Sequence, residues 1–111
     1  MKSSHIAKPA VVICKAVEFY STHDETSFFE WAKKLKCVKR IQGVHDEIWL
    51  HVHSRNISDR CLRELIALCF RYKVDMTQLQ QFLRASNKHW FGDKGFWFHR
   101  SIFARSSKPK V

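Results

Sequence analysis

The residues best suited by type and spacing to do chemistry are three histidines near the middle of the chain. His51 and His53 alternate along a predicted strand, so their imidazoles lie on one side of it, and His45 lies in the preceding turn. Zinc and nickel sites use imidazoles at this spacing. Only Asp46 and Glu47 are available to complete such a site, and their spacing does not direct them to it. A polar strand face explains the pattern better, so we predict neither a metal nor another cofactor.

A metal-independent nuclease is the second chemistry that the composition permits. It needs an acid and a base beside a phosphate-binding cation, and His51, His53 or His99 with Arg100 offer these groups. Seven histidines allow many such combinations and select none of them. The sequence has no Gly-rich phosphate loop, nucleophile elbow or Walker motif. We therefore predict a protein without enzymatic activity.

Nucleic-acid binding is a third possibility, because the C-terminal quarter alternates cations with rings that can stack on bases. These residues are Lys88, His89, Trp90, Phe91, Lys94, Trp97, His99, Arg100 and Arg105. The chain has 20 Lys and Arg against 10 Asp and Glu, a net charge of +10, which favours acidic partners. The excess lies at the ends, with six cations against one acid in residues 88–111. Solvated tails explain such an excess equally well, and rings at this density also fill small cores.

The hydrophobic pattern of the first half predicts a strand, a helix and a hairpin. Residues 10–20 are rich in Val and Ile without a helical period, which is typical of a strand. Thr22 and Glu25 fit a capping box, so a helix is expected to begin there. Residues 37–42 and 48–53 predict two paired strands. The second alternates strictly, with Ile48, Leu50 and Val52 on the buried face.

Two further helices are predicted in the second half. Ser58 caps the first of them, and Asp75 with Gln78 caps the second, which should end at Gly92. Their apolar stripes should be buried together. The central members of these stripes are Leu65, Ile66, Leu79, Leu83 and Trp90.

The chain is therefore expected to be a single small α+β domain over residues 10–105, in the order β-α-β-β-α-α. Residues 95–103 alternate imperfectly and predict an aromatic strap over the helices, or a last strand. Residues 1–9 and 106–111 are polar and basic, so we expect flexible ends.

The four cysteines are expected to be reduced core thiols, because they form no C-x-x-C pair and have apolar neighbours. Cys61 and Cys69 are eight residues apart on a predicted helix, about 12 Å, which is beyond disulfide reach. The apolar run of residues 9–13 is too short for a signal peptide, and no run approaches the ~20 residues of a membrane span. These features predict a cytoplasmic protein.

Residues 57–83, followed by 87–91 and 95–99, resemble small bacterial immunity proteins encoded beside polymorphic toxins, particularly those of contact-dependent growth inhibition systems. The similarity covers less than half of the chain. It implies a cytoplasmic protein that binds the C-terminal toxin domain of a neighbouring cell's effector, commonly a nuclease. Binding would block the active site or substrate groove of the toxin. DNA or RNA binding is the alternative function.

The charge of the chain constrains where such a toxin would bind. Nuclease toxins tend to be basic and their inhibitors acidic, which speeds association. An inhibitor with a charge of +10 needs an acidic toxin surface, or an interface built from its few carboxylates. The residues that we predict to bind the partner are Asp46, Glu47, Trp49, His51, His53, Lys94, Trp97, His99 and Arg100.

The predicted core leads to a first test. Leu65→Ala should lower the free energy of unfolding by about 2 to 5 kcal/mol, because it removes buried methyl groups and leaves a cavity. Urea denaturation measures the change. A loss below about 1 kcal/mol would show that the core lies elsewhere.

Overall fold

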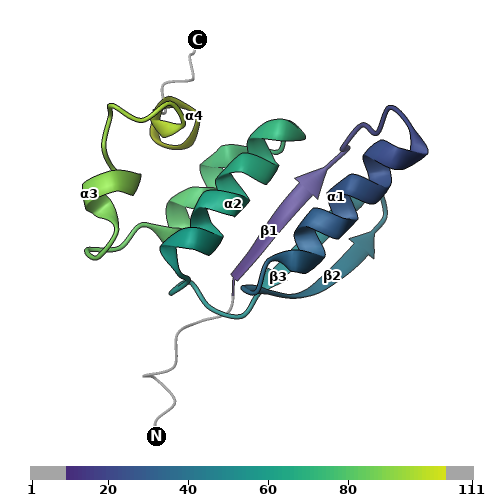
Figure 1. The fold of residues 1–111 in the computed structure, drawn as a ribbon, viewed down its shortest axis with the longest axis horizontal. Helices are drawn as coiled ribbons and strands as arrows, with labels where there is room; N and C mark the ends of the chain where they lie inside the picture. Colours follow the sequence, from purple (N-terminus) through teal and green to yellow (C-terminus); the bar gives the residue numbers. More distant parts are fainter. Residues whose placement is uncertain (1–9, 105–111) are drawn as a thin grey trace, which may run out of the picture.

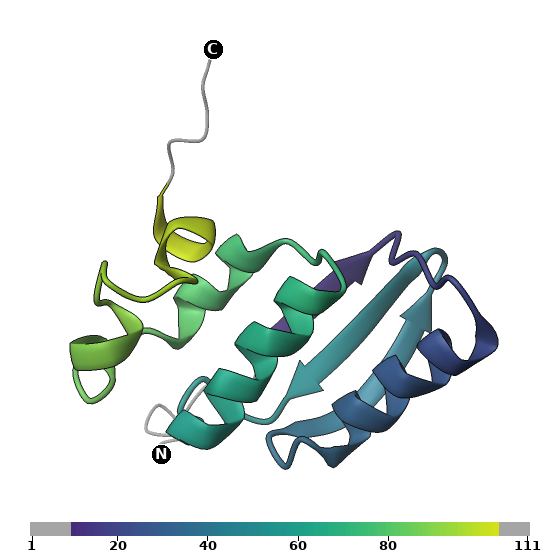
Figure 2. The same ribbon diagram turned by 45° about the horizontal axis from the view of Figure 1, so that its top comes forward.

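The computed structural model describes residues 10–104, which form a three-stranded antiparallel sheet with helices packed on one of its faces (Figures 1 and 2). The elements are β1 (Ala10–Lys15), α1 (Thr22–Lys34), β2 (Val38–Val44), β3 (Glu47–Val52), α2 (Asp59–Arg71), the 3-10 helix η2 (Met76–Phe82), α3 (Lys88–Phe91) and α4 (His99–Phe103). This arrangement confirms the α+β class and the predicted order of its elements as far as α2. The expected flexible ends, 1–9 and 106–111, lie outside the described residues.

The predicted hairpin forms the centre of the sheet. β3 pairs with β2 on one side and with β1 on the other, in the order β1-β3-β2. Leu50 and Val52 are buried beneath the helices, as their alternation predicted, and they pair with Val12 and Ala10 of β1. Helices α1 and α2 lie side by side over this face (Figure 2). The core therefore lies between one sheet face and these helices.

The N-terminus of α1 is capped one residue earlier than predicted. Ser21 is extended, and its Oγ accepts a hydrogen bond from the backbone N–H of Asp24 at 3.1 Å. The Asp24 carboxylate accepts the N–H of Tyr20 at 3.0 Å. The capping box expected from Thr22 and Glu25 is therefore wrong. A serine was available one position upstream, where its hydroxyl reaches a free N–H of the first turn.

The single helix predicted between Asp75 and Gly92 is also wrong. The chain instead forms η2, a turn, and the four-residue helix α3. Leu65, Ile66, Leu79 and Trp90 are buried as predicted, whereas Leu83 is 44% exposed because it lies at the end of η2, where the helical stripe stops.

Asn87 explains the interruption. Its side chain is buried, with Nδ2 donating to the carbonyl of Phe82 at 2.8 Å and Oδ1 accepting the N–H of Arg84 at 2.8 Å. A continuous helix would bond these backbone groups to other backbone groups. The amide satisfies them locally instead, so the chain can turn without leaving buried polar groups unpaired.

Two glutamines of η2 occupy the outer edge of β1. Gln78 accepts the N–H of Ile13 at 2.7 Å through Oε1 and donates to the carbonyl of the same residue at 2.8 Å. Gln81 donates to the carbonyl of Val11 at 3.3 Å. An exposed strand edge is a template for pairing with other chains, so these amides both anchor η2 and cover the edge.

Residues 95–103 form turns followed by α4, so the alternative of a last strand is wrong. Phe98 and Ile102 are buried and attach the segment to the helices, as expected of a strap. Phe98 contacts Trp90 and Phe91, with ring centroids 6.1 Å apart in both pairs. Spacing of these apolar residues by four, rather than by two, suits a short helix.

The expectation of four reduced thiols is wrong for one pair. Cys37, just before β2, forms a disulfide with Cys61 in the first turn of α2, with Cα atoms 6.4 Å apart. Helix packing brings these distant positions together, which spacing along the sequence does not reveal. Cys14 and Cys69 are free and buried, and burial raises the pKa of the Cys14 thiol to about 12.

The disulfide allows a test of stability. Replacing Cys37 and Cys61 together by Ser should lower the free energy of unfolding by about 3 kcal/mol, because a loop closed over 24 residues is released in the unfolded chain. Native protein measured with a reductant should show the same loss. Equal stability of the native and doubly substituted proteins under oxidising conditions would contradict this account.

Candidate functional site

The predicted residues of the hairpin lie on the sheet face that points away from the helices. Trp49 and His51 alternate with the buried Leu50. The Trp49 indole N–H donates to Oε1 of Glu47 at 2.8 Å, and the same carboxylate lies 3.9 Å from Nζ of Lys15. These groups bind one another, so the polar side chains at this part of the face offer a partner few free hydrogen-bonding groups.

His51 belongs to the same surface. Its Nε2 lies 2.8 Å from Oε1 of Gln42 and 3.3 Å from Nη2 of Arg40. Partial burial, and then the positive charges of Arg40 and Lys39, hold the pKa of His51 below its ordinary value. These effects favour the neutral imidazole, which serves as a hydrogen-bonding group of the sheet.

The candidate metal ligands are not gathered at one point. His45 lies in the turn before β3, at positive φ, whereas His53 follows the opposite end of that strand and is exposed. Asp46 is also exposed in the turn. Within residues 10–104, no three His, Cys, Asp or Glu side chains are grouped so that they could hold a metal ion.

The histidine pairs proposed for a nuclease also lie apart. His99 and Arg100 belong to α4, which stands on the far side of α2 from the sheet that carries His51 (Figure 1). The His99 ring packs on Phe103, with centroids 4.9 Å apart. The structure therefore does not combine these groups into an acid, a base and a phosphate-binding cation.

Most of the C-terminal rings fill the core. Trp90, Phe91 and Phe98 are buried, and the guanidinium of Arg63 lies 3.9 Å from the centroid of the Trp90 ring, a cation–π contact. Lys88 and Lys94 are exposed beside them. The rings that were candidates for base stacking are therefore mostly inaccessible to a nucleic acid.

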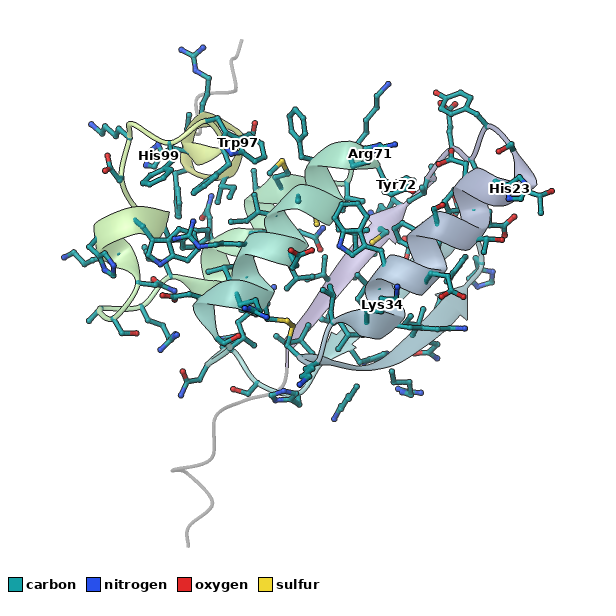
Figure 3. All side chains as sticks on the ribbon, in the orientation of Figure 1. His23, Lys34, Arg71, Tyr72, Trp97 and His99 are labelled. Atoms are coloured by element: carbon teal, nitrogen blue, oxygen red, sulfur yellow. A yellow bond between two sulfur atoms is a disulfide. The ribbon has the colours of Figure 1, made fainter. Side chains whose placement is uncertain are left out.

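Trp97 is the exception, and it pairs with a residue that sequence reasoning missed. Trp97 is 59% exposed and Phe70 of α2 is 56% exposed, and their rings meet edge to face at 4.8 Å. Figure 3 shows Trp97 at the junction of α4 and α2. One sequence feature points to Phe70, because it lies seven residues after Arg63 and therefore on the polar side of an amphipathic helix. We call Phe70 and Trp97 the aromatic pair.

A shallow groove of about 390 Å³ adjoins the aromatic pair. It is lined by Cys69, Phe70, Lys73, Val74, Met76 and Ser101. Four of these six lining residues are apolar, and Lys73 is the only charged side chain among them. A shallow, partly apolar surface with one cation suits one inserted side chain.

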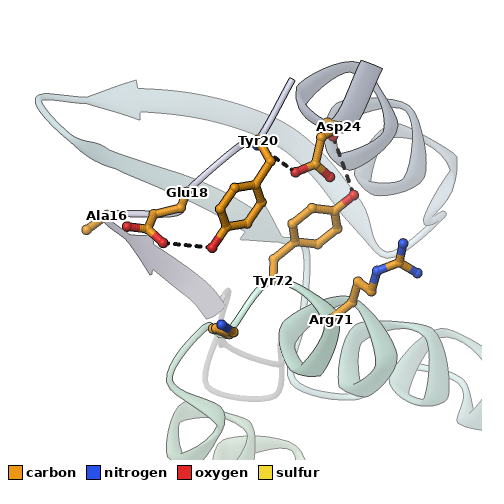
Figure 4. A pocket seen from close by; sticks show the side chains of 7 residues that line it. Ala16, Glu18, Tyr20, Asp24, Arg71 and Tyr72 are labelled. Carbon is orange, nitrogen blue, oxygen red and sulfur yellow. Dashed lines mark hydrogen bonds between the residues drawn. The ribbon is translucent and has the colours of Figure 1, made fainter. Parts of the chain in front are cut away.

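A second cleft, of about 330 Å³, lies between the end of β1 and the adjoining ends of α1 and α2 (Figure 4). Tyr20 donates to Glu18 at 3.0 Å, and this hydrogen bond raises the pKa of Tyr20. Tyr72 donates to the carbonyl of Asp24 at 3.4 Å. The tyrosines and carboxylates of this cleft bond to one another or to backbone at the start of α1, whereas Arg71 and Lys73 have no carboxylate within 4 Å among the described residues.

Among the predicted partner-binding residues, only Trp97 is a large apolar residue with an exposed side chain. The aromatic pair with its groove is therefore the best candidate site.

No described helix has the length and apolar character needed to cross a membrane. Comparison of the chain with models of protein families, with curated proteins and with solved structures finds no match.

The environment of His51 predicts its titration. By NMR, its midpoint should lie below the ordinary value of 6.5, and Arg40→Gln should raise it by removing a repelling charge. Because the folded pKa is the lower one, the contribution of this group to stability is complete above about 6.5 and is lost as pH falls through the folded pKa. A midpoint at or above 6.5 in the native protein would refute this description.

Proposed function

We propose that this chain is a non-catalytic immunity protein, which binds the toxin domain of a contact-dependent growth inhibition effector and neutralises it by occupying its surface. Two features support the proposal. The first is the resemblance of residues 57–83, 87–91 and 95–99 to such proteins. The second, which carries most weight, is the exposed aromatic pair of Phe70 and Trp97.

Covering this pair with another surface would be favourable, because it would remove apolar rings from water. Burial of a Phe side chain stabilises a protein by about 1.5 to 3 kcal/mol relative to exposure. Large aromatic side chains, Trp above all, dominate the binding energy of protein interfaces. Phe70 and Trp97 come from separate segments and are held against each other, so little conformational entropy would be lost when a partner binds.

The same observation favours a protein partner over a nucleic acid. Stacking on bases needs several accessible rings along a cationic track, whereas Trp90 and Phe91 are buried. Of the Trp and Phe rings in the predicted basic aromatic cluster, only Trp97 is exposed. A single exposed pair beside an apolar groove is more typical of a protein hot spot.

The proposal places the protein in the cytoplasm, where glutathione would reduce the bond between Cys37 and Cys61. Losing about 3 kcal/mol leaves a domain folded if its stability is in the ordinary range of about 5 to 15 kcal/mol. The reduced protein is therefore expected to keep its fold and its binding activity.

The test uses the toxin domain of a large secreted effector encoded directly beside this chain. Co-expression of the native chain should restore growth. Trp97→Ala and Phe70→Ala should each weaken binding at least about tenfold, measured by calorimetry, because each removes a buried anchor. Tyr20→Ala is the matched control, since Tyr20 is an aromatic residue with 76% exposure that does not line the groove beside the pair. Undiminished toxicity in the presence of soluble native chain would overturn the proposal.

Catalysis is tested separately. The purified chain should degrade neither RNA nor DNA, with or without zinc, and His51→Ala and His53→Ala should leave protection unchanged, because occupancy needs no proton transfer. Turnover that disappears in either variant would overturn the non-catalytic function.

A further inference from the structure

We infer that the partner of this chain presents an acidic surface around one protruding aromatic or aliphatic side chain. That side chain would enter the groove beside Phe70, while the surrounding carboxylates pair with cations of this chain. The inference rests on the proposed function and specifies the chemistry of the surface that the toxin domain offers. Its basis is the combination of shape, charge and composition around the aromatic pair.

The groove is the reason for expecting one protruding apolar side chain on the partner. Val74 and Met76 are buried and line it together with Cys69, and Phe70 forms its exposed rim. Met side chains adapt to the shape of what packs on them, which suits a groove that accepts one inserted side chain. A Leu, Met or Phe of the partner would bury apolar surface on both sides.

Exposed cations near the groove are the reason for expecting an acidic surface on the partner. Lys73 lines the groove, and Arg100 directly precedes Ser101, another lining residue. Both of these cations are exposed, and neither of them has a carboxylate within 4 Å among the described residues. No carboxylate lines the groove. Charges that have no partner in the free chain gain most from carboxylates brought by another molecule.

Other occupants of this surface are disfavoured by the same charges. The chain's own C-terminal residues beyond α4 include Arg105, Lys108 and Lys110 and no acid. A second copy would bring the same cations and a further charge of +10. Both would place like charges together, which is unfavourable in an interface. An acidic protein is favoured instead, and the net charge would also steer it during association.

Substitution of Lys73 should remove a charge at the groove without weakening the fold. It occupies the left-handed region, with φ of 60°, directly after the end of α2. The N–H groups of Lys73 and Val74 cap the helix by bonding to the carbonyls of Phe70 and Cys69, at 3.3 and 2.9 Å. Asn and Gly adopt this conformation more easily than Lys. Lys73→Asn and Lys73→Gly should therefore fold at least as well as the native chain.

The experiment selects peptides from a random phage-displayed library on the immobilised native protein. Enriched peptides should combine a Phe, Trp, Leu or Met with two or more Asp or Glu. Binding of the best synthetic peptide should weaken several-fold between ~50 and ~200 mM salt, as expected of paired exposed charges. Lys73→Asn should weaken it about threefold to tenfold, and Trp97→Ala at least tenfold. Lys33→Gln, which removes an exposed charge from α1, is the matched control and should bind as the native chain does.

Several outcomes would overturn the inference. Enrichment of basic or uncharged peptides would do so, as would acidic peptides whose affinity is unchanged by Lys73→Asn and Trp97→Ala. A labelled 20-nucleotide single strand that binds at ~50 mM salt, and is lost with Trp97→Ala, would replace the protein partner by nucleic acid. Acidic peptides that bind this surface while the neighbouring toxin stays active would retain the inference and refute the immunity function. If the chain neutralises the toxin and this does not depend on Trp97 or Lys73, the immunity function is retained and the inference is refuted.

Discussion

Burial of the apolar stripe of α2 is the constraint on which the rest of the structure depends. Leu62, Leu65 and Ile66 have almost no exposed surface, and α2 lies between the sheet with α1 on one side and the C-terminal segment on the other (Figure 1). With the stripe turned inward, the opposite side of the helix must carry Arg63 and Phe70. Packing of the core therefore also determines which α2 side chains are available to a partner.

Side-chain amides then decide how the C-terminal third is arranged around α2. Gln78 holds η2 against the edge of β1, and Asn87 satisfies the backbone groups where the chain turns after η2. The turn redirects the chain through α3 to α4, where Phe98 and Ile102 attach it to the core. Trp97 is left next to Phe70 as a consequence. The aromatic pair thus depends on buried polar contacts far from it.

The contrast between the two candidate surfaces is chemical. On the open sheet face, Glu47, Trp49 and His51 engage their neighbours, so a partner would have to compete with existing hydrogen bonds. At the aromatic pair, large rings and uncompensated cations have no such partners within the described residues. Binding there would gain burial and charge pairing while breaking few contacts, which is why the functional proposal rests on that surface.

Several features were determined by sequence alone because they depend on neighbours within one or two turns. The alternation of Leu50 and Val52 specified the buried strand face, and Ser58 specified the start of α2, where its hydroxyl accepts the N–H of Cys61 at 3.1 Å. The buried stripe of α2 was likewise predictable from its period. The residue type alone makes Trp97 a candidate for binding, whereas its exposure depends on the tertiary structure.

The remaining features were decided by tertiary structure, because they join residues that local patterns do not relate. Asn87 broke a helix that the period of Leu79, Leu83 and Trp90 had predicted, since its amide satisfies buried backbone groups only in the folded chain. The disulfide of Cys37 and Cys61 requires α2 to pack beside the end of α1. Phe70 meets Trp97 only after the chain has passed through η2 and α3, and no spacing rule spans that distance.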